Sequence, residues 1–256
     1  MCLVFLAFQA DADFPVLVGA NREESRRRPS TPPVCSRSES VRCVMAGVDR
    51  GPDGTFPEIG TWLGVNEAGL VVAVTNRRDG ELAWADQVRS RGLLAVSLLG
   101  FDGPSKAVQF ARGELAEGGF GGCNYLIANG EAAVIVQAPG SRRITARGLT
   151  PGIHAMTNLD LDDGDDPRIR FVHENLEPEQ FVASARRICR DERIVIRGLE
   201  RGTVSSSLIL VGTAVRFYHI MGDPGAGEYE EYRTFIRPEI SMEGWPDGQG
   251  ETTTER

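Results

Sequence analysis

The chain opens with Met1-Cys2-Leu3-Val4-Phe5-Leu6-Ala7-Phe8, a nearly unbroken apolar run. Chain ends usually fray unless other elements hold them in place. A run of about seven apolar residues, some of them β-branched or aromatic, is typical of a strand that is covered on both faces. The sequence therefore predicts that a buried strand begins almost at the first residue, and that the remaining elements are arranged around it.

The second residue of this strand is Cys2. Methionine aminopeptidase removes Met1 when the next side chain is small, and Cys2 would then carry both a thiol and a free α-amine. An unperturbed α-amine has a pKa of about 7.7–8.0 and a free thiol of about 8.5, so the amine can accept the thiol proton near neutral pH without a histidine. Cys2 is therefore either a catalytic nucleophile or a small buried strand residue, since cysteine is often buried.

A hairpin is expected over the first twenty residues. Asp11-Ala12-Asp13 is typical of a turn, and the apolar stretch from Pro15 to Ala20 is typical of a second strand. In a hairpin, the exit of the second strand lies beside the start of the first. The polar stretch Asn21-Arg22-Glu23-Glu24 is therefore expected close to Cys2.

The rest of the chain alternates between strand-rich and helix-rich segments in an order that no βαβ repeat explains. Residues 25–57 are expected to form a loop-rich substrate rim with one short strand near 43–48, and residues 60–76 a second hairpin. Helical spacing covers residues 86–99, 104–117 and 178–192. Strands are expected at 124–128, 132–137, 141–146, 152–158, 204–211 and 214–221. This order predicts an α+β fold with antiparallel sheets and helices on their outer faces.

Composition narrows the class of protein. The 256 residues are 41% hydrophobic and 25% charged, which predicts one soluble domain over residues 1–242 and a disordered Gly-, Glu- and Thr-rich tail over 243–256. The net charge of -8 argues against nucleic acid or an anionic membrane surface as the main partner. Because no stretch approaches the ~18–20 apolar residues of a membrane span and no signal peptide is evident, we expect a cytoplasmic protein without stable membrane insertion. Composition leaves the oligomeric state open.

Two further features concern cysteine and arginine. The cysteines are odd in number and form no CxxC pair, so neither a disulfide framework nor a zinc site is expected; they are Cys2, Cys35, Cys43, Cys123 and Cys189. Two basic clusters, Arg26-Arg27-Arg28 and Arg77-Arg78, are either solvated loop residues or a site for an anionic group of a substrate.

Several short motifs occur in a fixed order: Met1-Cys2, Asn21-Arg22-Glu23-Glu24, Thr61-Trp62-Leu63-Gly64, Thr75-Asn76, Gly119-Phe120 with Asn124, Gly152 to Asn158, and Thr203 to Val211. This ordered set runs from residue 1 to about residue 235. It resembles the NRDE family, the homologues of the transport and Golgi organisation protein 2.

The resemblance implies an N-terminal nucleophile (Ntn) hydrolase-like fold, an αββα sandwich of two antiparallel sheets between helical layers. A more distant similarity is to the cysteine-starting Ntn amidases that cleave conjugated bile salts and penicillin V. By motif position, it implies that Cys2 attacks a carbonyl, that Glu23 holds the α-amine, and that Asn76 and Asn158 supply oxyanion and positioning donors. The residues expected to contact the substrate are Asn21, Arg22, Trp62 and Asn124.

The implied function is hydrolysis of a small amide or thioester by Cys2, with no cofactor or metal required. The resemblance leaves a second function open, because homologues have been linked to haem trafficking and to lipid or acyl-CoA metabolism. The protein would then be a non-catalytic carrier of haem or of a lipid-like ligand. Candidate haem ligands are His154, His173, His219 or a thiolate, although no CxxCH or other dedicated haem motif is present.

Overall fold

The computed structural model describes residues 2–38, 41–49, 60–79, 89–140 and 143–236. The first sheet contains β1 (Leu3–Phe8), β2 (Val16–Ser25), β10 (Gly152–Met156), β11 (Arg201–Val211), β12 (Ala214–Met221) and β13 (Glu230–Ile236). The second contains β3 (Ser30–Ser38), β4 (Val41–Asp49), β5 (Leu63–Asn66), β6 (Val71–Asn76), β7 (Cys123–Ala128), β8 (Ala133–Gly140) and β9 (Arg143–Gly148).

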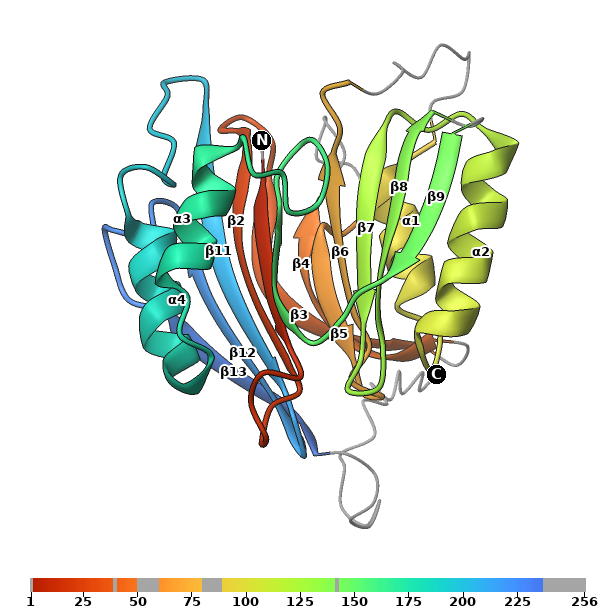
Figure 1. The fold of residues 1–256 in the computed structure, drawn as a ribbon, viewed down its shortest axis with the longest axis horizontal. Helices are drawn as coiled ribbons and strands as arrows, with labels where there is room; N and C mark the ends of the chain where they lie inside the picture. Colours follow the sequence, from red (N-terminus) through yellow and green to blue (C-terminus); the bar gives the residue numbers. More distant parts are fainter. Residues whose placement is uncertain (1, 39–40, 50–59, 80–88, 141–142, 237–256) are drawn as a thin grey trace, which may run out of the picture.

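The two sheets lie face to face (Figure 1). The strand order is β10-β1-β2-β11-β12-β13 in the first sheet and β3-β4-β5-β6-β7-β8-β9 in the second. Every pairing in both sheets is antiparallel. The predicted antiparallel architecture is therefore confirmed, with β1 in the interior of its sheet between β10 and β2.

Helices cover the outer face of each sheet (Figure 1). The second sheet is covered by α1 (Arg91–Leu98) and α2 (Pro104–Glu117), and the first by α3 (Pro167–Asn175), the short 3-10 helix η1 (Pro178–Gln180) and α4 (Phe181–Arg190). None of the helices in the described ranges is long and apolar enough to cross a membrane. The layer order is helix, sheet, sheet, helix, as the α+β prediction requires.

Strand β1 is buried on both faces, as its sequence predicts. All six residues are at most 3% exposed. Val4, Leu6 and Phe8 belong to the core between the two sheets. Leu3, Phe5 and Ala7 alternate with them and pack in the core beneath α3 and α4. One strand thus contributes to both hydrophobic cores.

Some expectations for the first third of the chain are wrong. Residues 25–49 are not a loop-rich rim with one short strand, because β3 and β4 form a long antiparallel pair. Pro32 and Pro33 lie within β3, where the ladder shifts register between Thr31 and Val34. β3 is an edge strand of the described sheet, and such edges tolerate proline because one row of N–H groups has no ladder partner. Residues 50–59 lie outside the described part of the chain.

Other differences concern helix α3 and strand β13, neither of which was expected from the sequence. α3 follows the acidic segment directly, because Asp166 caps it and Pro167 occupies its first turn. The helix expected over 178–192 is η1 followed by α4, which ends at Arg190. In the described part of 86–99, helix begins at Arg91. The expected tail at 243–256 lies outside the described residues.

Gly19 provides a test of this packing. It pairs with Phe5 across the β1–β2 ladder, and a Cβ at Gly19 would overlap the Phe5 ring. Gly19→Ala should therefore lower the free energy of unfolding by about 1–3 kcal/mol, measured by urea denaturation. Gly148→Ala is the matched control, since a Cβ at this strand residue meets nothing within 4 Å and should change stability by less than about 0.5 kcal/mol. Equal effects would contradict the packing described.

Candidate active site

Cys2 directly precedes β1 and is a half-buried free thiol. Leu3 pairs with Asn21 and Val4 with Met156. Continuing both ladders to the end of the strand places Cys2 between Arg22 on one side and Asn158 on the other. The predicted proximity of Cys2 to the polar end of β2 is thus confirmed. By the alternation of β1, the Cys2 side chain lies on the face that is turned toward the second sheet.

The thiol of Cys2 is not activated by its surroundings alone. Burial raises the pKa of the Cys2 thiol, while a hydrogen bond from the Glu23 backbone and the charge of Arg22 act in the opposite direction. Arg22 is itself only 2% exposed. Because the thiolate is the nucleophilic form, a thiol with a raised pKa needs a base close by.

Glu23 of β2 has a buried carboxylate that pairs with Arg168 of helix α3. Its side chain is 2% exposed, and its Oε2 atom lies 3.4 Å from Nη1 of Arg168. Burial raises the pKa of Glu23 to about 7, although Arg168 favours the ionised form. Desolvation therefore outweighs the ion pair. A carboxylate in this position can accept a hydrogen bond from an amine and can exchange a proton near neutral pH.

Arg168 is held in turn by the first turn of α3. Asp166 accepts a hydrogen bond from the Arg168 backbone N–H at 2.8 Å and another from Thr157 Oγ1 at 2.7 Å. These contacts connect the end of β10 to α3, and through Arg168 to Glu23 on β2. Sequence analysis missed Arg168 and Asp166; the Asp-Pro pair at 166–167 was the available signal, because it is a typical helix start.

Asn158 lies at the other side of Cys2 and is 4% exposed. Its side-chain Nδ2 atom donates to the backbone carbonyl oxygen of Asn76 at 2.5 Å. The backbone carbonyl oxygen of Asn158 accepts from the Arg78 backbone N–H at 2.9 Å. Among the described residues, its buried Oδ1 atom has no hydrogen-bond partner. An unpaired buried acceptor costs about 1–3 kcal/mol. The amide can therefore accept from a bound N–H group, and its second N–H can donate to a carbonyl oxygen.

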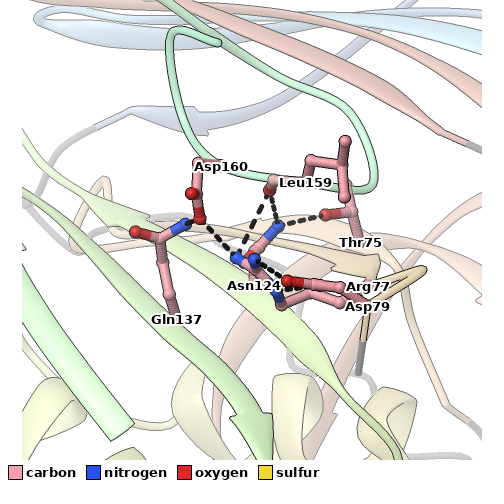
Figure 2. A network of polar contacts seen from close by, with 7 residues as sticks. All are labelled: Thr75, Arg77, Asp79, Asn124, Gln137, Leu159 and Asp160. Atoms are coloured by element: carbon pink, nitrogen blue, oxygen red, sulfur yellow. Dashed lines mark hydrogen bonds and ion pairs between the residues drawn. The ribbon is translucent and has the colours of Figure 1, made fainter. Parts of the chain in front are cut away.

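The loop after Asn158 is fixed to the second sheet by polar side chains (Figure 2). We call this set the Asn124 clamp; it comprises Thr75, Arg77, Asn124, Gln137, Leu159 and Asp160. Asn124 Nδ2 donates to the Leu159 carbonyl at 2.8 Å, and Arg77 Nη1 pairs with Asp160 Oδ1 at 2.8 Å. The clamp therefore joins strands β6, β7 and β8 to the segment that carries Asn158.

The remaining residues expected at the site have different positions. Asn21 is fully buried, and its Nδ2 atom donates to the Cys189 carbonyl of α4 at 2.9 Å, on the helical side of the sheet. The Asn76 side chain is exposed, and this residue contributes its backbone carbonyl. Trp62 is 6% exposed and packs in the larger hydrophobic core, which includes residues of both sheets and of helices α1 and α2. Asn124 is fully buried in the clamp. Cys2, Arg22, Glu23 and Asn158 are the expected residues that the structure brings together.

The histidines that could ligate haem are engaged in other contacts. Both ring nitrogens of His154 have partners, Asp162 Oδ2 at 2.7 Å and the Thr150 carbonyl at 2.8 Å. His173 approaches the same Asp162. His219 is buried and contacts Ser207 at 2.8 Å. Within the described ranges, no group of three or more His, Cys, Asp or Glu side chains could hold a metal ion.

Solved structures with the same architecture define the class of fold. The N-acylethanolamine-hydrolyzing acid amidase ortholog of Caenorhabditis elegans is 14% identical with a TM-score of 0.57, covering 91% of this chain and all of that one (100%). Penicillin V acylase of Agrobacterium tumefaciens is 13% identical with a TM-score of 0.52, covering 86% of this chain and 83% of that one. The protein therefore has an Ntn-hydrolase-like fold.

The family is given by sequence. The family model "Transport and Golgi organisation 2" matches residues 1–201, and the chain belongs to this family, as its ordered motifs predict. The human "Transport and Golgi organization protein 2 homolog" is 31% identical over 108 residues, which is 40% of this chain. That match spans 36% of the human protein, or about a third of its length.

The raised pKa of Glu23 predicts that the free energy of unfolding depends on pH. Between its ordinary value of 4.5 and about 7, the folded protein binds a proton that the unfolded chain has lost, so stability falls as pH rises through this window. Glu23→Gln removes this dependence. Between pH 5 and pH 8, the unfolding free energy of the wild type should fall relative to that of Glu23→Gln by about 2–3 kcal/mol, measured by urea denaturation. A constant difference between the two proteins would contradict the assignment.

Proposed function

We propose that the protein is an N-terminal-nucleophile-type hydrolase that uses Cys2 to cleave a small amide or thioester. The observation that supports this proposal most is that Cys2, Glu23 and Asn158 meet at the N-terminal end of β1. The support from the comparisons is the shared fold, whose solved examples include, by their names, an acylase and an amidase. That this chain catalyses the same class of reaction is part of our proposal.

The first half of the reaction forms an acyl-enzyme. Once Met1 is removed, the Cys2 α-amine takes the thiol proton and the sulfur attacks the substrate carbonyl, which becomes a tetrahedral oxyanion. The second N–H of the Asn158 amide donates to this oxygen. The resulting ammonium then returns its proton to the leaving nitrogen or sulfur as the bond to the carbonyl carbon breaks, and a thioester to Cys2 remains.

The second half returns the free enzyme. The α-amine takes a proton from water as the water oxygen attacks the thioester, and the proton passes to the Cys2 sulfur when it leaves. Glu23 holds the amine in place through both halves and stabilises its ammonium form. Because Arg168 contacts the same carboxylate, it limits how strongly Glu23 favours the ammonium over the neutral amine that must act as base.

Substitution of Cys2 separates catalysis from packing. Cys2→Ala should abolish turnover on any substrate that a screen of acyl-amides and thioesters identifies, while changing the unfolding free energy by less than about 1 kcal/mol. Leu6→Ala, in the same strand, is the matched control for packing: Leu6 is 1% exposed, and its truncation should cost about 2–5 kcal/mol. A strongly destabilised Cys2→Ala protein that keeps its activity would make Cys2 a structural residue.

A further inference from the structure

We propose that the Asn124 clamp is a positioning device that sets where the Asn158 amide lies relative to Cys2. The inference rests on the proposed function, because it assigns the clamp to the step in which an oxyanion forms at the carbonyl attacked by Cys2. Cys2 directly precedes β1 of the first sheet, whereas the second sheet or the residue after one of its strands supplies Thr75, Arg77, Asn124 and Gln137. The geometry of the site would then depend on a contact between the two sheets.

Arg77 is the charged centre of the clamp. Its side chain is 4% exposed and pairs with Asp79 and Asp160, each at 2.8 Å. Its Nη1 atom also donates to Asn124 Oδ1 at 3.0 Å. The hydrogen bond to Asp79 raises the pKa of Arg77 further, which keeps the guanidinium charged. Burying a guanidinium is costly unless its donors are satisfied, and here two carboxylates and an amide oxygen satisfy them.

Both the oxygen and the nitrogen of the Asn124 side-chain amide form hydrogen bonds in the clamp (Figure 2). Its oxygen accepts from Arg77, while its Nδ2 atom donates to the Leu159 carbonyl at 2.8 Å and contacts Thr75 Oγ1 at 3.3 Å. Gln137 Nε2, from the neighbouring strand, donates to Asp160 Oδ1 at 2.9 Å. The adjacent strands β7 and β8, together with Arg77 directly after β6, therefore hold residues 159 and 160, the two that follow Asn158.

The end of β6 and the residues after it contact this segment at successive positions. The Asn76 carbonyl accepts from the Asn158 side chain, and the Arg78 backbone N–H donates to the Asn158 carbonyl. Between them, Arg77 pairs with Asp160. Displacement of Arg77 or Asn124 would therefore move the Asn158 amide. Oxyanion stabilisation depends on donors 2.7–3.1 Å from the developing charge, and a misplacement of about 1 Å can reduce the rate about 100-fold.

Two reactions of the same thiol distinguish positioning from general stability. Acylation of Cys2 by p-nitrophenyl acetate passes through an oxyanion, whereas alkylation by iodoacetamide is a substitution at a saturated carbon and forms none. Both require that the thiol is accessible and can lose its proton. A variant that disturbs only the position of Asn158 should slow acylation and spare alkylation, while a variant that loosens the whole site should change both.

The experiment measures both rates at Cys2, resolved by peptide mass spectrometry because other cysteines also react. Arg77→Lys keeps the charge but loses the planar fork of donors. We expect its acylation rate to fall about 10–100-fold and its alkylation rate to change by less than about twofold. Arg89→Lys is the matched control, since Arg89 pairs with Glu114 and Glu117 of the outer helix α2. Both of its rates should match the wild type.

Asp160→Asn provides a second variant should Arg77→Lys fail to fold, because the Asp160 side chain is 71% exposed. In this variant the acylation rate should fall by a smaller factor, about 3–10-fold, while the alkylation rate is again spared. Equal acylation in the wild type and the variants, or parallel loss of acylation and alkylation, would overturn the positioning role. Absence of Cys2 acylation in the wild type would instead contradict the proposed function, and with it this inference.

Discussion

The antiparallel pairing of β1 with β10 on one side and β2 on the other holds the first sheet together at the candidate site. This strand is buried on both faces and contributes side chains to the core between the sheets and to the core under α3 and α4. It therefore fixes the position of both neighbouring strands. Since Cys2 directly precedes β1, continuing the same pairing by one residue places Cys2 between Arg22 and Asn158.

Burial also determines the chemistry available at this position. It raises the pKa of the Cys2 thiol and of the Glu23 carboxyl, so neither group is held strongly in its charged form near neutral pH. A nucleophilic role for Cys2 would therefore require a base that can take one proton and return it. An α-amine on Cys2 meets this requirement, whereas an internal Cys2 with a peptide bond on its nitrogen does not.

The features that follow from local sequence could be predicted. The apolar run at residues 3–8 predicts a strand buried on both faces, and the hairpin places the polar end of β2 beside Cys2. Features set by tertiary context could not. Pro32 and Pro33 are typical of a loop, but an edge strand with a shifted register accommodates them. Helix α3 has only nine residues and directly follows the acidic segment, so its Asp-Pro start was the available local signal.

In the candidate site, too, local sequence predicts some features, and tertiary context determines the others. The motif order identifies Cys2, Glu23 and Asn158, which the structure brings together. It does not distinguish Asn21, whose side chain lies on the helical face of the sheet, from residues on the inner face. No sequence pattern links Arg77 to Asp160, because they are distant in the chain and meet only when the two sheets stack.

Whether Cys2 carries a free α-amine is decided by the intact mass of the protein purified from its native host, with sequencing of its N-terminal peptide. We expect Met1 to be absent and the mature chain to begin at Cys2, with a free α-amine on the same residue as the thiol. A chain that retains Met1, or any residue before Cys2, in most of the active protein would contradict the proposed mechanism, because the nitrogen of Cys2 would then be an amide and could not act as the base.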